Sequence, residues 1–332
     1  MSTYYRPLVQ HGPTRPAGAF PLAGQSLWFT HVEVFRHNAA PEVAVASDVP
    51  KAMLDRLTST RPAVSGLDMN TPHIMGILNA TPDSFSDGGV HNSVAAARAS
   101  AADMVSHGAT ILDIGGESTR PGAKFVPENE EIARTCPLID AIREETGVLI
   151  SIDTRKASVA KAACKAGAGL VNDVSGFTFD PELAPFCAAQ RAPVCVMHMQ
   201  GDPATMQDNP QYGNVLLDVY DFLETQIALL EGLGLSRDLI VVDPGIGFGK
   251  TEDHNLTLLR NLSLFHGLGC PILLGVSRKG FIGSIGQESD KTARAPGSIA
   301  VALAGLSQGV QIIRAHDVAE TSQALRLWAA VR

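Results

Sequence analysis

From about residue 73 onward, the chain repeats one plan: a short apolar run ends in polar residues or glycine, and an amphipathic segment with helical spacing follows. In chain order the runs read HIMGILN, ATILDIGG, VLISIDT, GLVNDVSG, APVCVMHM, LIVVD, PILLGVSR and VQIIRAHD. Short runs rich in Val, Ile and Leu are typical of parallel strands that are buried on both faces. Eight strand–helix units over roughly 260 residues match the count and length of a (β/α)8 barrel, so the pattern predicts a TIM barrel.

A doubly wound open sheet is the alternative α/β fold for such a pattern. That fold usually carries a Gly-x-Gly-x-x-Gly turn after its first strand. Here the first run is followed by ATPDSFSDGG, which lacks this turn. The helical segments have recognisable boundaries: Ser93 is expected to cap the first helix, and Pro137 is expected to kink the second. The barrel is therefore the favoured fold.

Residues 1–70 differ from the barrel segment, residues 71–332, in being Pro-rich. They contain one β-like stretch, SLWFTHVEVF, and one short helical candidate, DVPKAMLDRL. We expect this N-terminal extension to form a hairpin or cap that closes the bottom of the barrel, opposite the chemistry. A separate binding module remains open, although no residue pattern in the extension indicates a chemical function.

The bulk composition narrows the classes of function. Hydrophobic residues make up 45% of the chain, which is ample for a sizeable core. A net charge of −8 without a long basic run argues against a nucleic-acid surface. The five cysteines are scattered and form no Cys-x-x-Cys pair, and neither a signal peptide nor a membrane span is readable. A cytoplasmic protein with reduced thiols is expected.

Polar residues gather at the ends of the apolar runs, where a barrel of this kind forms its active site. Asp153, Asn172 and Asp243 end otherwise apolar runs, where an unpaired polar group would be costly to bury. Two carboxylates and an amide facing one cavity can accept several N–H bonds from a flat, nitrogen-rich heterocycle, and structural salt bridges inside the barrel are the open alternative. The complete set is Asn79, Asp113, Glu117, Thr119, Arg120, Asp153, Asn172, Asp173, His198, Asp243, Ser277, Arg278, Lys279, Arg314 and His316.

The stretch DPGIGFGKT, residues 243–251, looks like a phosphate-binding loop. The P-loop pattern requires a glycine at position 244, where this chain has Pro244. Proline has no backbone N–H to offer a phosphate, and Asp243 would place a carboxylate beside it. Lys250 is therefore predicted to be a structural or rim residue. For His198, a core position and a functional one remain equally open.

Eight segments carry a resemblance to a known family. In order they read GILNATPDSFSDGG, DIGGESTRPG, VLISIDT, LVNDVSG, VCVMHMQG, VVDPGIGFGK, GVSRKGFIG and IIRAHDV. Together they closely resemble the dihydropteroate synthase family of the folate pathway, from about residue 72 to the C-terminus. Two positions depart from the family pattern: Ala80, where a valine is more common, and Gly280, where other members carry a side chain.

The resemblance implies a transferase that joins 4-aminobenzoate to 6-hydroxymethyl-7,8-dihydropterin diphosphate and releases pyrophosphate. It assigns the pterin diphosphate to Asp153, Asn172, Asp243, Lys279, Arg314 and His316. It assigns 4-aminobenzoate to Phe85, Thr119, Arg120, Pro121, Phe248 and Ser277. The catalytic residues it implies are Asn79, Lys279, Arg314 and His316, with Asn79 as the Mg2+ ligand. A homodimer is a further expectation from the family.

Two other functions are weighed against the synthase. A pterin-dependent methyltransferase uses a similar Asp/Asn/Asp pocket, but it needs neither a diphosphate site nor the TRPG and SRK loops. A non-catalytic paralogue that binds pterin is the second, and an assay for dihydropteroate decides between this protein and an enzyme. The synthase is the favoured function.

Overall fold

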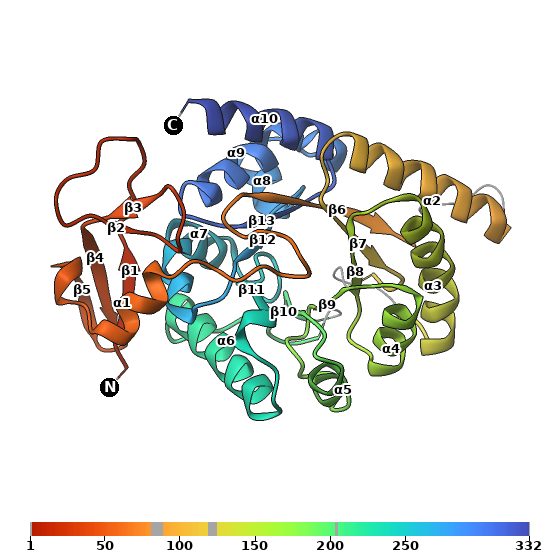
Figure 1. Ribbon diagram of the computed structural model, residues 1–332, viewed down its shortest axis with the longest axis horizontal. Helices are drawn as coiled ribbons and strands as arrows, with labels where there is room; N and C mark the ends of the chain where they lie inside the picture. The colour runs from red at the N-terminus through yellow and green to blue at the C-terminus, as the bar shows by residue number, and fades with distance from the viewer. Residues whose placement is uncertain (1, 81–88, 119–124, 203–204, 332) are drawn as a thin grey trace.

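The computed structural model of the protein describes residues 2–80, 89–118, 125–202 and 205–331, with the backbone alone for residues 89–93. Figure 1 shows a barrel with its surrounding helices and, at the left, a smaller unit formed by the N-terminal extension. None of the helices in these ranges is long and apolar enough to cross a membrane.

The barrel is a sheet of parallel strands in the order β11-β10-β9-β8-β7-β6-β13-β12. A parallel bridge between Val242 and Ile272, with the Val242 N–H donating to the Pro271 carbonyl (2.9 Å), joins the edge strands β11 and β12. The strands are β6 (His73–Asn79), β7 (Ile111–Gly115), β8 (Leu149–Asp153), β9 (Leu170–Asp173), β10 (Val194–Met197), β11 (Ile240–Asp243), β12 (Leu273–Gly275) and β13 (Ile312–Ala315). This topology confirms the predicted TIM barrel.

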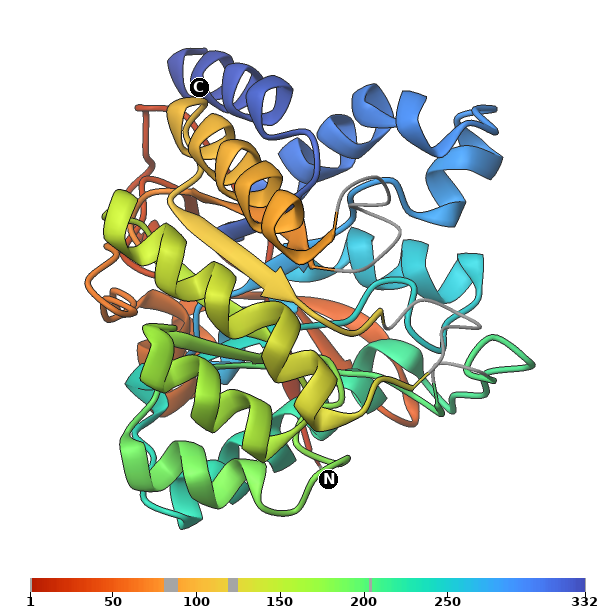
Figure 2. The same cartoon turned by 90° about the vertical axis from the view of Figure 1, so that its right-hand side faces the viewer.

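Helices cover the outside of the sheet, and Figure 2 shows three of them, α2 to α4, in front of the strands. The helices are α2 (Gly89–Ser106), α3 (Glu128–Glu145), α4 (Ala157–Ala166), α5 (Leu183–Gln190), α6 (Val215–Gly232), α7 (Glu252–Arg260), α8 (Gly280–Ile285), α9 (Ala295–Leu306) and α10 (Val318–Ala330). The predicted N-terminal cap at Ser93 is wrong, because the backbone is already helical from Gly89. Pro137 lies inside α3, which continues on both sides of it.

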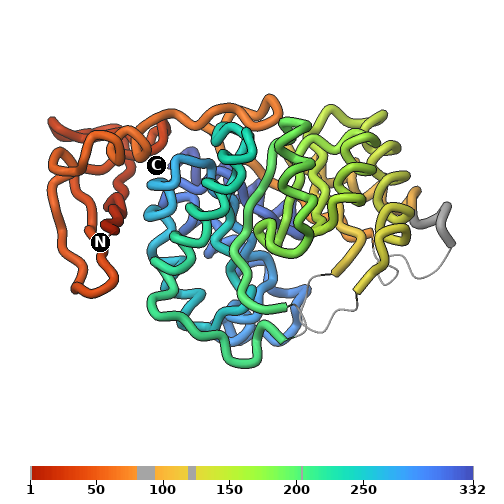
Figure 3. The backbone as a smooth tube through the Cα atoms, turned by 90° about the horizontal axis from the view of Figure 1, so that it is seen from below, coloured from red at the N-terminus to blue at the C-terminus, as the bar shows by residue number. Residues whose placement is uncertain are grey.

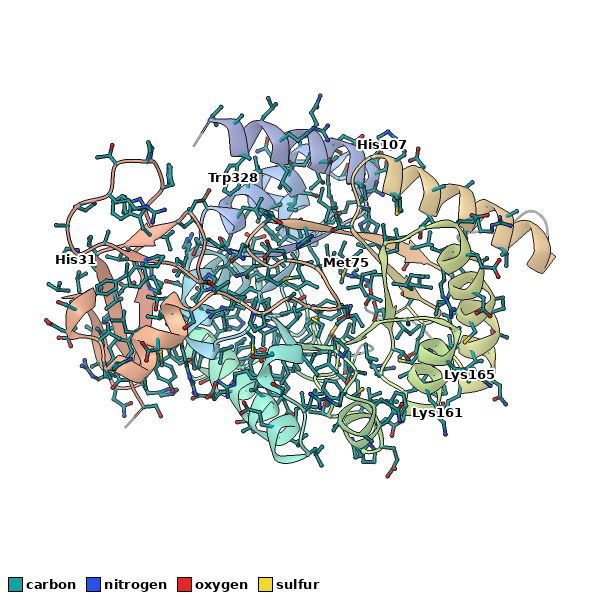
Figure 4. All side chains as sticks on the ribbon, in the orientation of Figure 1. His31, Met75, His107, Lys161, Lys165 and Trp328 are labelled. Atoms are coloured by element: carbon teal, nitrogen blue, oxygen red, sulfur yellow. The ribbon has the colours of Figure 1, made fainter. Side chains whose placement is uncertain are left out.

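Successive side chains along the strands point to opposite faces of the sheet and belong to two separate hydrophobic clusters. On β7, Leu112 and Ile114 belong to the core between strands and helices, whereas Ile111 belongs to a second cluster inside the barrel. Met75, near the middle of the barrel in Figure 4, also belongs to the inner cluster. This cluster comes from the beginnings of the strands, so it forms the floor beneath the strand ends where the site lies.

Residues 2–58 form a unit with a small core of its own around Phe29. An antiparallel sheet of order β1-β4-β5 packs beside the barrel, against residues 262–268 and α6. The Tyr4 hydroxyl donates to the Asp221 carboxylate of α6 (2.8 Å), and the Ser263 hydroxyl donates to the Pro7 carbonyl (2.9 Å). Its elements are β1 (Tyr4–Pro7), β2 (Phe20–Pro21), β3 (Trp28–Phe29), β4 (His31–Arg36), β5 (Ala39–Val45) and α1 (Lys51–Thr58).

The segment after α1 crosses the bottom of the barrel. Val64 and Met69 are fully buried in the inner cluster, and the Ser65 hydroxyl donates to the Gly169 carbonyl (2.7 Å) just before β9. In Figure 3 this orange segment runs along the upper edge of the molecule, from the N-terminal unit to the barrel. The extension therefore contacts the barrel twice: its sheet lies at the side, and its last residues lie beneath the floor.

Candidate active site

Side chains from four strands meet above the floor of the barrel. The Arg314 guanidinium, from β13, donates from Nε to Asp113 Oδ2 (2.6 Å) and from Nη2 to Asp153 Oδ2 (2.9 Å). The Asn172 amide, from β9, donates to the same Asp113 oxygen (3.2 Å). Three predicted pterin-site residues, Asp153, Asn172 and Arg314, are therefore brought together, with Asp113 between two of them.

The buried ion pairs set the electrostatics of this cluster. Burial opposes the charge on Arg314, but Asp113 and Asp153 outweigh burial and raise its pKa, so the guanidinium stays protonated. Burial, reinforced by Asp113, raises the pKa of Asp153, while Arg314 opposes the rise. The Arg314 guanidinium, 2.9 Å from Asp153 Oδ2, favours the charged form of this carboxylate. The oxygen atoms of the cluster are acceptors, which suits a ligand rich in N–H donors.

Asp243 ends β11 with one carboxylate oxygen already used. Its Oδ1 accepts the Gly245 N–H (2.7 Å), and its side chain is buried. Burial raises the pKa of Asp243 to about 6, although Gly245, Lys279 and Arg314 each favour the charged form. Oδ2 faces the neighbouring strand at Gly275, where a Cβ would lie 3.7 Å from it. The absence of a side chain there leaves this side of the carboxylate uncovered.

Lys279 and Phe248 lie beside Asp243. The Lys279 ammonium is 4.1 Å from the centre of the Phe248 ring, within the range of a cation–π contact. Lys279 is the residue before α8, whereas Phe248 belongs to the turn after β11. Two predicted residues of different assignment, one for pterin and one for 4-aminobenzoate, therefore contact each other.

A serine that follows β12 and a histidine that follows β13 contact each other. The Ser277 hydroxyl lies 2.9 Å from His316 Nδ1, and it also accepts the His316 backbone N–H (3.1 Å). The neighbouring Arg278 turns away, with a left-handed backbone (φ 58°) and an ion pair to Asp317. This arrangement keeps the basic side chain of Arg278 apart from Lys279 and fixes the ring of His316.

The lysine of the apparent phosphate loop is interior. The Lys250 side chain is buried, and its ammonium contacts His198 Nδ1 and two backbone carbonyls of the turn within 3.0 Å. These contacts confirm the prediction that Lys250 is structural. His198 is buried as well, with its ring edge-on to Phe222 (4.9 Å between ring centres), so the core reading of this histidine holds.

Asn79, the predicted Mg2+ ligand, ends β6 and is half-buried. Asp173 points elsewhere and accepts the N–H groups of Ser175 and Phe177, which shapes the turn after β9. The predicted residues Phe85, Thr119, Arg120 and Pro121 lie outside the described residues.

A buried ionic network anchors the described ends of the segment after β7. Glu117 accepts the Val126 N–H (2.9 Å) and a guanidinium N–H of Arg155 (3.0 Å). Lys156 donates to the Val126 carbonyl (2.6 Å) and to Glu131 (2.7 Å). Burial opposes the charge on Glu117, yet these contacts outweigh burial and lower its pKa. Both backbone polar groups of one residue, Val126, are thus held by side chains that follow β7 and β8.

Asp113 orients two of its neighbours in the site. Its carboxylate is fully buried and is shared by Arg314 and Asn172. Its Oδ1 has no hydrogen-bond partner within the described chain. Strand alternation in ATILDIGG carried the signal, because Asp113 shares the inward face with Ile111 and Gly115.

Comparison with known proteins first identifies the protein family of this chain. Residues 75–316 match the model of a family described as "Pterin binding enzyme". The chain is 45% identical over 263 residues to dihydropteroate synthase of Escherichia coli (strain K12), covering 79% of this chain and 93% of the relative. It is 47% identical over 251 residues to dihydropteroate synthase of Synechocystis, covering 76% and 87%.

A solved structure agrees. Xanthomonas albilineans dihydropteroate synthase with 4-aminobenzoic acid superposes with a TM-score of 0.77 at 42% identity, over 82% of this chain and 97% of the other. The chain therefore belongs to the dihydropteroate synthase family of pterin-binding enzymes. It is a transferase of folate biosynthesis, and the relatives favour this activity over that of a methyltransferase.

Proposed function

We propose that the residues above carry out the synthase reaction as follows: 4-aminobenzoate is joined to 6-hydroxymethyl-7,8-dihydropterin diphosphate, and pyrophosphate leaves. The observation that carries this proposal is the group formed by buried Asp153, Asn172 and Asp243 and half-buried Arg314 at the ends of four strands. A flat heterocycle with several N–H donors matches this mixture of acceptors and one cation.

Asp243 is proposed to hold the amidine side of the pterin. With Oδ1 accepting the Gly245 N–H, Oδ2 remains to accept from the ring N3–H or the 2-amino group. Such charge-assisted bonds combine strength with a fixed direction. Lys279, beside Asp243, would donate to the ring carbonyl and to N5. Asp153 and Asn172 would bind the opposite edge of the ring.

Arg314 and His316 are proposed to receive the diphosphate. Arg314 uses Nε and Nη2 for Asp113 and Asp153, so Nη1 is the nitrogen proposed for a phosphate oxygen. His316 lies two residues further along, with Nδ1 of its ring 2.9 Å from the Ser277 hydroxyl, and its ring is proposed to contact the phosphate. Cations near the leaving group stabilise the negative charge that develops as the C–O bond breaks.

Mg2+ fits this site only as an ion that arrives with the diphosphate. In the described ranges of the chain, no three His, Cys, Asp or Glu side chains are arranged to hold a metal ion. Asn79 offers one neutral oxygen, and Mg2+ commonly combines few protein ligands with substrate phosphates. When bound, the ion would neutralise charge on the departing pyrophosphate.

The chemical step needs no protein nucleophile. The bond between the pterin methylene carbon and the diphosphate oxygen breaks, and its electron pair leaves with pyrophosphate. The aminobenzoate nitrogen then attacks the methylene carbon and loses one proton to solvent. Phe248 and Ser277 would border the aminobenzoate, together with Phe85, Thr119, Arg120 and Pro121. Carboxylates close to the pterin would stabilise the cation-like methylene.

One turnover assay tests the proposal. Purified protein with both substrates and Mg2+ should release pyrophosphate and form dihydropteroate, whereas 4-aminobenzoate without the pterin substrate should give none. Binding of pterin without turnover would instead identify a non-catalytic paralogue. A homodimer and a cytoplasmic location are also proposed from the family pattern, and size-exclusion chromatography with light scattering tests the first of these.

A further inference from the structure

The ammonium of Lys250 has the surroundings of a bound cation. It donates to His198 Nδ1 (2.8 Å), to the Gly245 carbonyl (2.8 Å) and to the Phe248 carbonyl (3.0 Å), and it lies 3.3 Å from the His198 carbonyl. Only 3% of the residue is exposed. Burial lowers the pKa of Lys250 to about 7, although Asp243 opposes the fall, and in its ammonium form the lysine has donors and no acceptors, so Nδ1 of His198 is then the unprotonated nitrogen. Burial, reinforced by Lys250, lowers the pKa of His198 to about 2, which agrees with a neutral ring.

These acceptors belong to two chain segments that pack face to face. The turn of residues 244–249 lies on the backbone that follows β10. A Cβ at Gly245 would come within 1.9 Å of the His198 carbonyl oxygen, and a Cβ at Gly249 within 2.3 Å of the Gln200 carbonyl oxygen. Both glycines have positive φ, 69° and 62°. The close approach turns several carbonyl groups toward one point, and Lys250 Nζ occupies that point.

The turn held in this way carries two groups of the proposed site. At its beginning, the Gly245 N–H donates to Asp243 Oδ1, so the position of Gly245 sets the orientation of the carboxylate. Near its end, Phe248 offers its carbonyl to Lys250 and its ring to Lys279. Lys250 bonds to the carbonyls of these same two residues, Gly245 and Phe248.

We propose that Lys250 is a positioning residue: its ammonium fixes the turn of residues 244–249, and through this turn it sets the orientation of Asp243 toward the pterin and of Phe248 toward 4-aminobenzoate. The inference rests on the proposed function for the identity of the two substrates. It differs from the role of a P-loop lysine, because the ammonium donates to His198 and to backbone carbonyls of the turn.

The test replaces Lys250 with methionine, which keeps most of the length and removes the charge. Lys250→Met should raise the KM of both substrates about tenfold or more, while inhibition by pyrophosphate stays within twofold of the wild type. Amide hydrogen exchange in residues 243–250 should become faster. Lys161→Met is the matched control, because Lys161 is exposed on the outer surface of α4 (Figure 4), and it should change none of these quantities.

Each outcome has a distinct meaning. Unchanged exchange in residues 243–250 would show that Lys250 does not hold the turn, and unchanged KM values with faster exchange would show that the turn does not orient the site. A large loss of pyrophosphate inhibition would make Lys250 a phosphate ligand after all. If the wild type forms no dihydropteroate, the proposed function fails, while the exchange measurement still tests the anchoring.

A second pair of variants covers the case in which Lys250→Met does not fold. His198→Asn keeps an acceptor close to the position of Nδ1, whereas His198→Leu removes it. The asparagine variant should keep both KM values within about twofold of the wild type. The leucine variant should raise both KM values severalfold and make amide hydrogen exchange of residues 243–250 faster. Equal behaviour of the two variants would overturn the proposed role of the Lys250 contacts.

Discussion

Replacing Asp243 with asparagine tests the pterin assignment most directly. Because Oδ1 accepts the Gly245 N–H at 2.7 Å, the asparagine should keep its oxygen on that side and place its amide nitrogen where Oδ2 lies now. A donor would then face the N–H donors of the pterin, and a charged hydrogen bond would be lost. Losing that bond and leaving one group unsatisfied costs on the order of 2–4 kcal/mol. At about 1.4 kcal/mol per tenfold, affinity should fall roughly 30- to 700-fold.

Isothermal titration with the pterin diphosphate measures this change in affinity. Asp140→Asn is the control, because Asp140 is an exposed carboxylate on α3, and this variant should bind like the wild type. Circular dichroism would verify that both variants keep the fold. If Asp243→Asn binds the pterin as tightly as the wild type does, the pocket has been placed on the wrong strand ends.

Three further predictions concern the diphosphate, pH and the extension. Arg314→Ala should weaken pyrophosphate inhibition and severely lower the single-turnover rate at saturating Mg2+. Lys250→Ala should change both quantities distinctly less. A larger effect of Lys250→Ala would place the anion site on the turn after β11. Burial raises the pKa of Asp243 to about 6, so its charge is lost as pH falls through this value. Affinity for 6-hydroxymethyl-7,8-dihydropterin, measured by titration calorimetry, should therefore decrease from pH 7 to pH 5. Asp243→Asn should weaken this pH dependence. The same raised pKa makes the folded state bind more protons than the unfolded state between pH 3.8 and about 6, so the contribution of Asp243 to stability is present below 3.8 and is lost as pH rises through 6. Deleting residues 1–60 keeps Val64 and Met69 of the inner cluster. The truncated protein should have a lower Tm in a thermal melt, and both its KM values should stay within about twofold of the wild type. Loss of aminobenzoate binding without a change in Tm would place the extension in the active site.

The barrel could be predicted from the sequence because its signal is local and repeated. Each apolar run is short, and each ends in a polar residue or glycine, so strand type and strand end can be read without knowledge of long-range contacts. The same reading placed Asp153, Asn172 and Arg314 at strand ends, where the structure brings them together.

Partners across the barrel could not be predicted in this way. Asp113 and Arg314 are separated by 201 positions, and only the closed barrel brings them within hydrogen-bond distance. Strand alternation places Asp113 on the inward face, but the two residues that it orients, Arg314 and Asn172, are seen only in the folded chain. Lys250 shows the same limit, because its role depends on His198, 52 positions away.

The bridge between Val242 and Ile272 gives the barrel a seam. Along most of the sheet several residues pair with each neighbouring strand, but β11 and β12 meet through this bridge, which lies one residue before Asp243 and three residues before Gly275. A pterin bound by Asp243 of β11 and by Lys279 after β12 would contact the chain on both sides of this seam, so its binding would connect the two edges where the sheet itself joins them least.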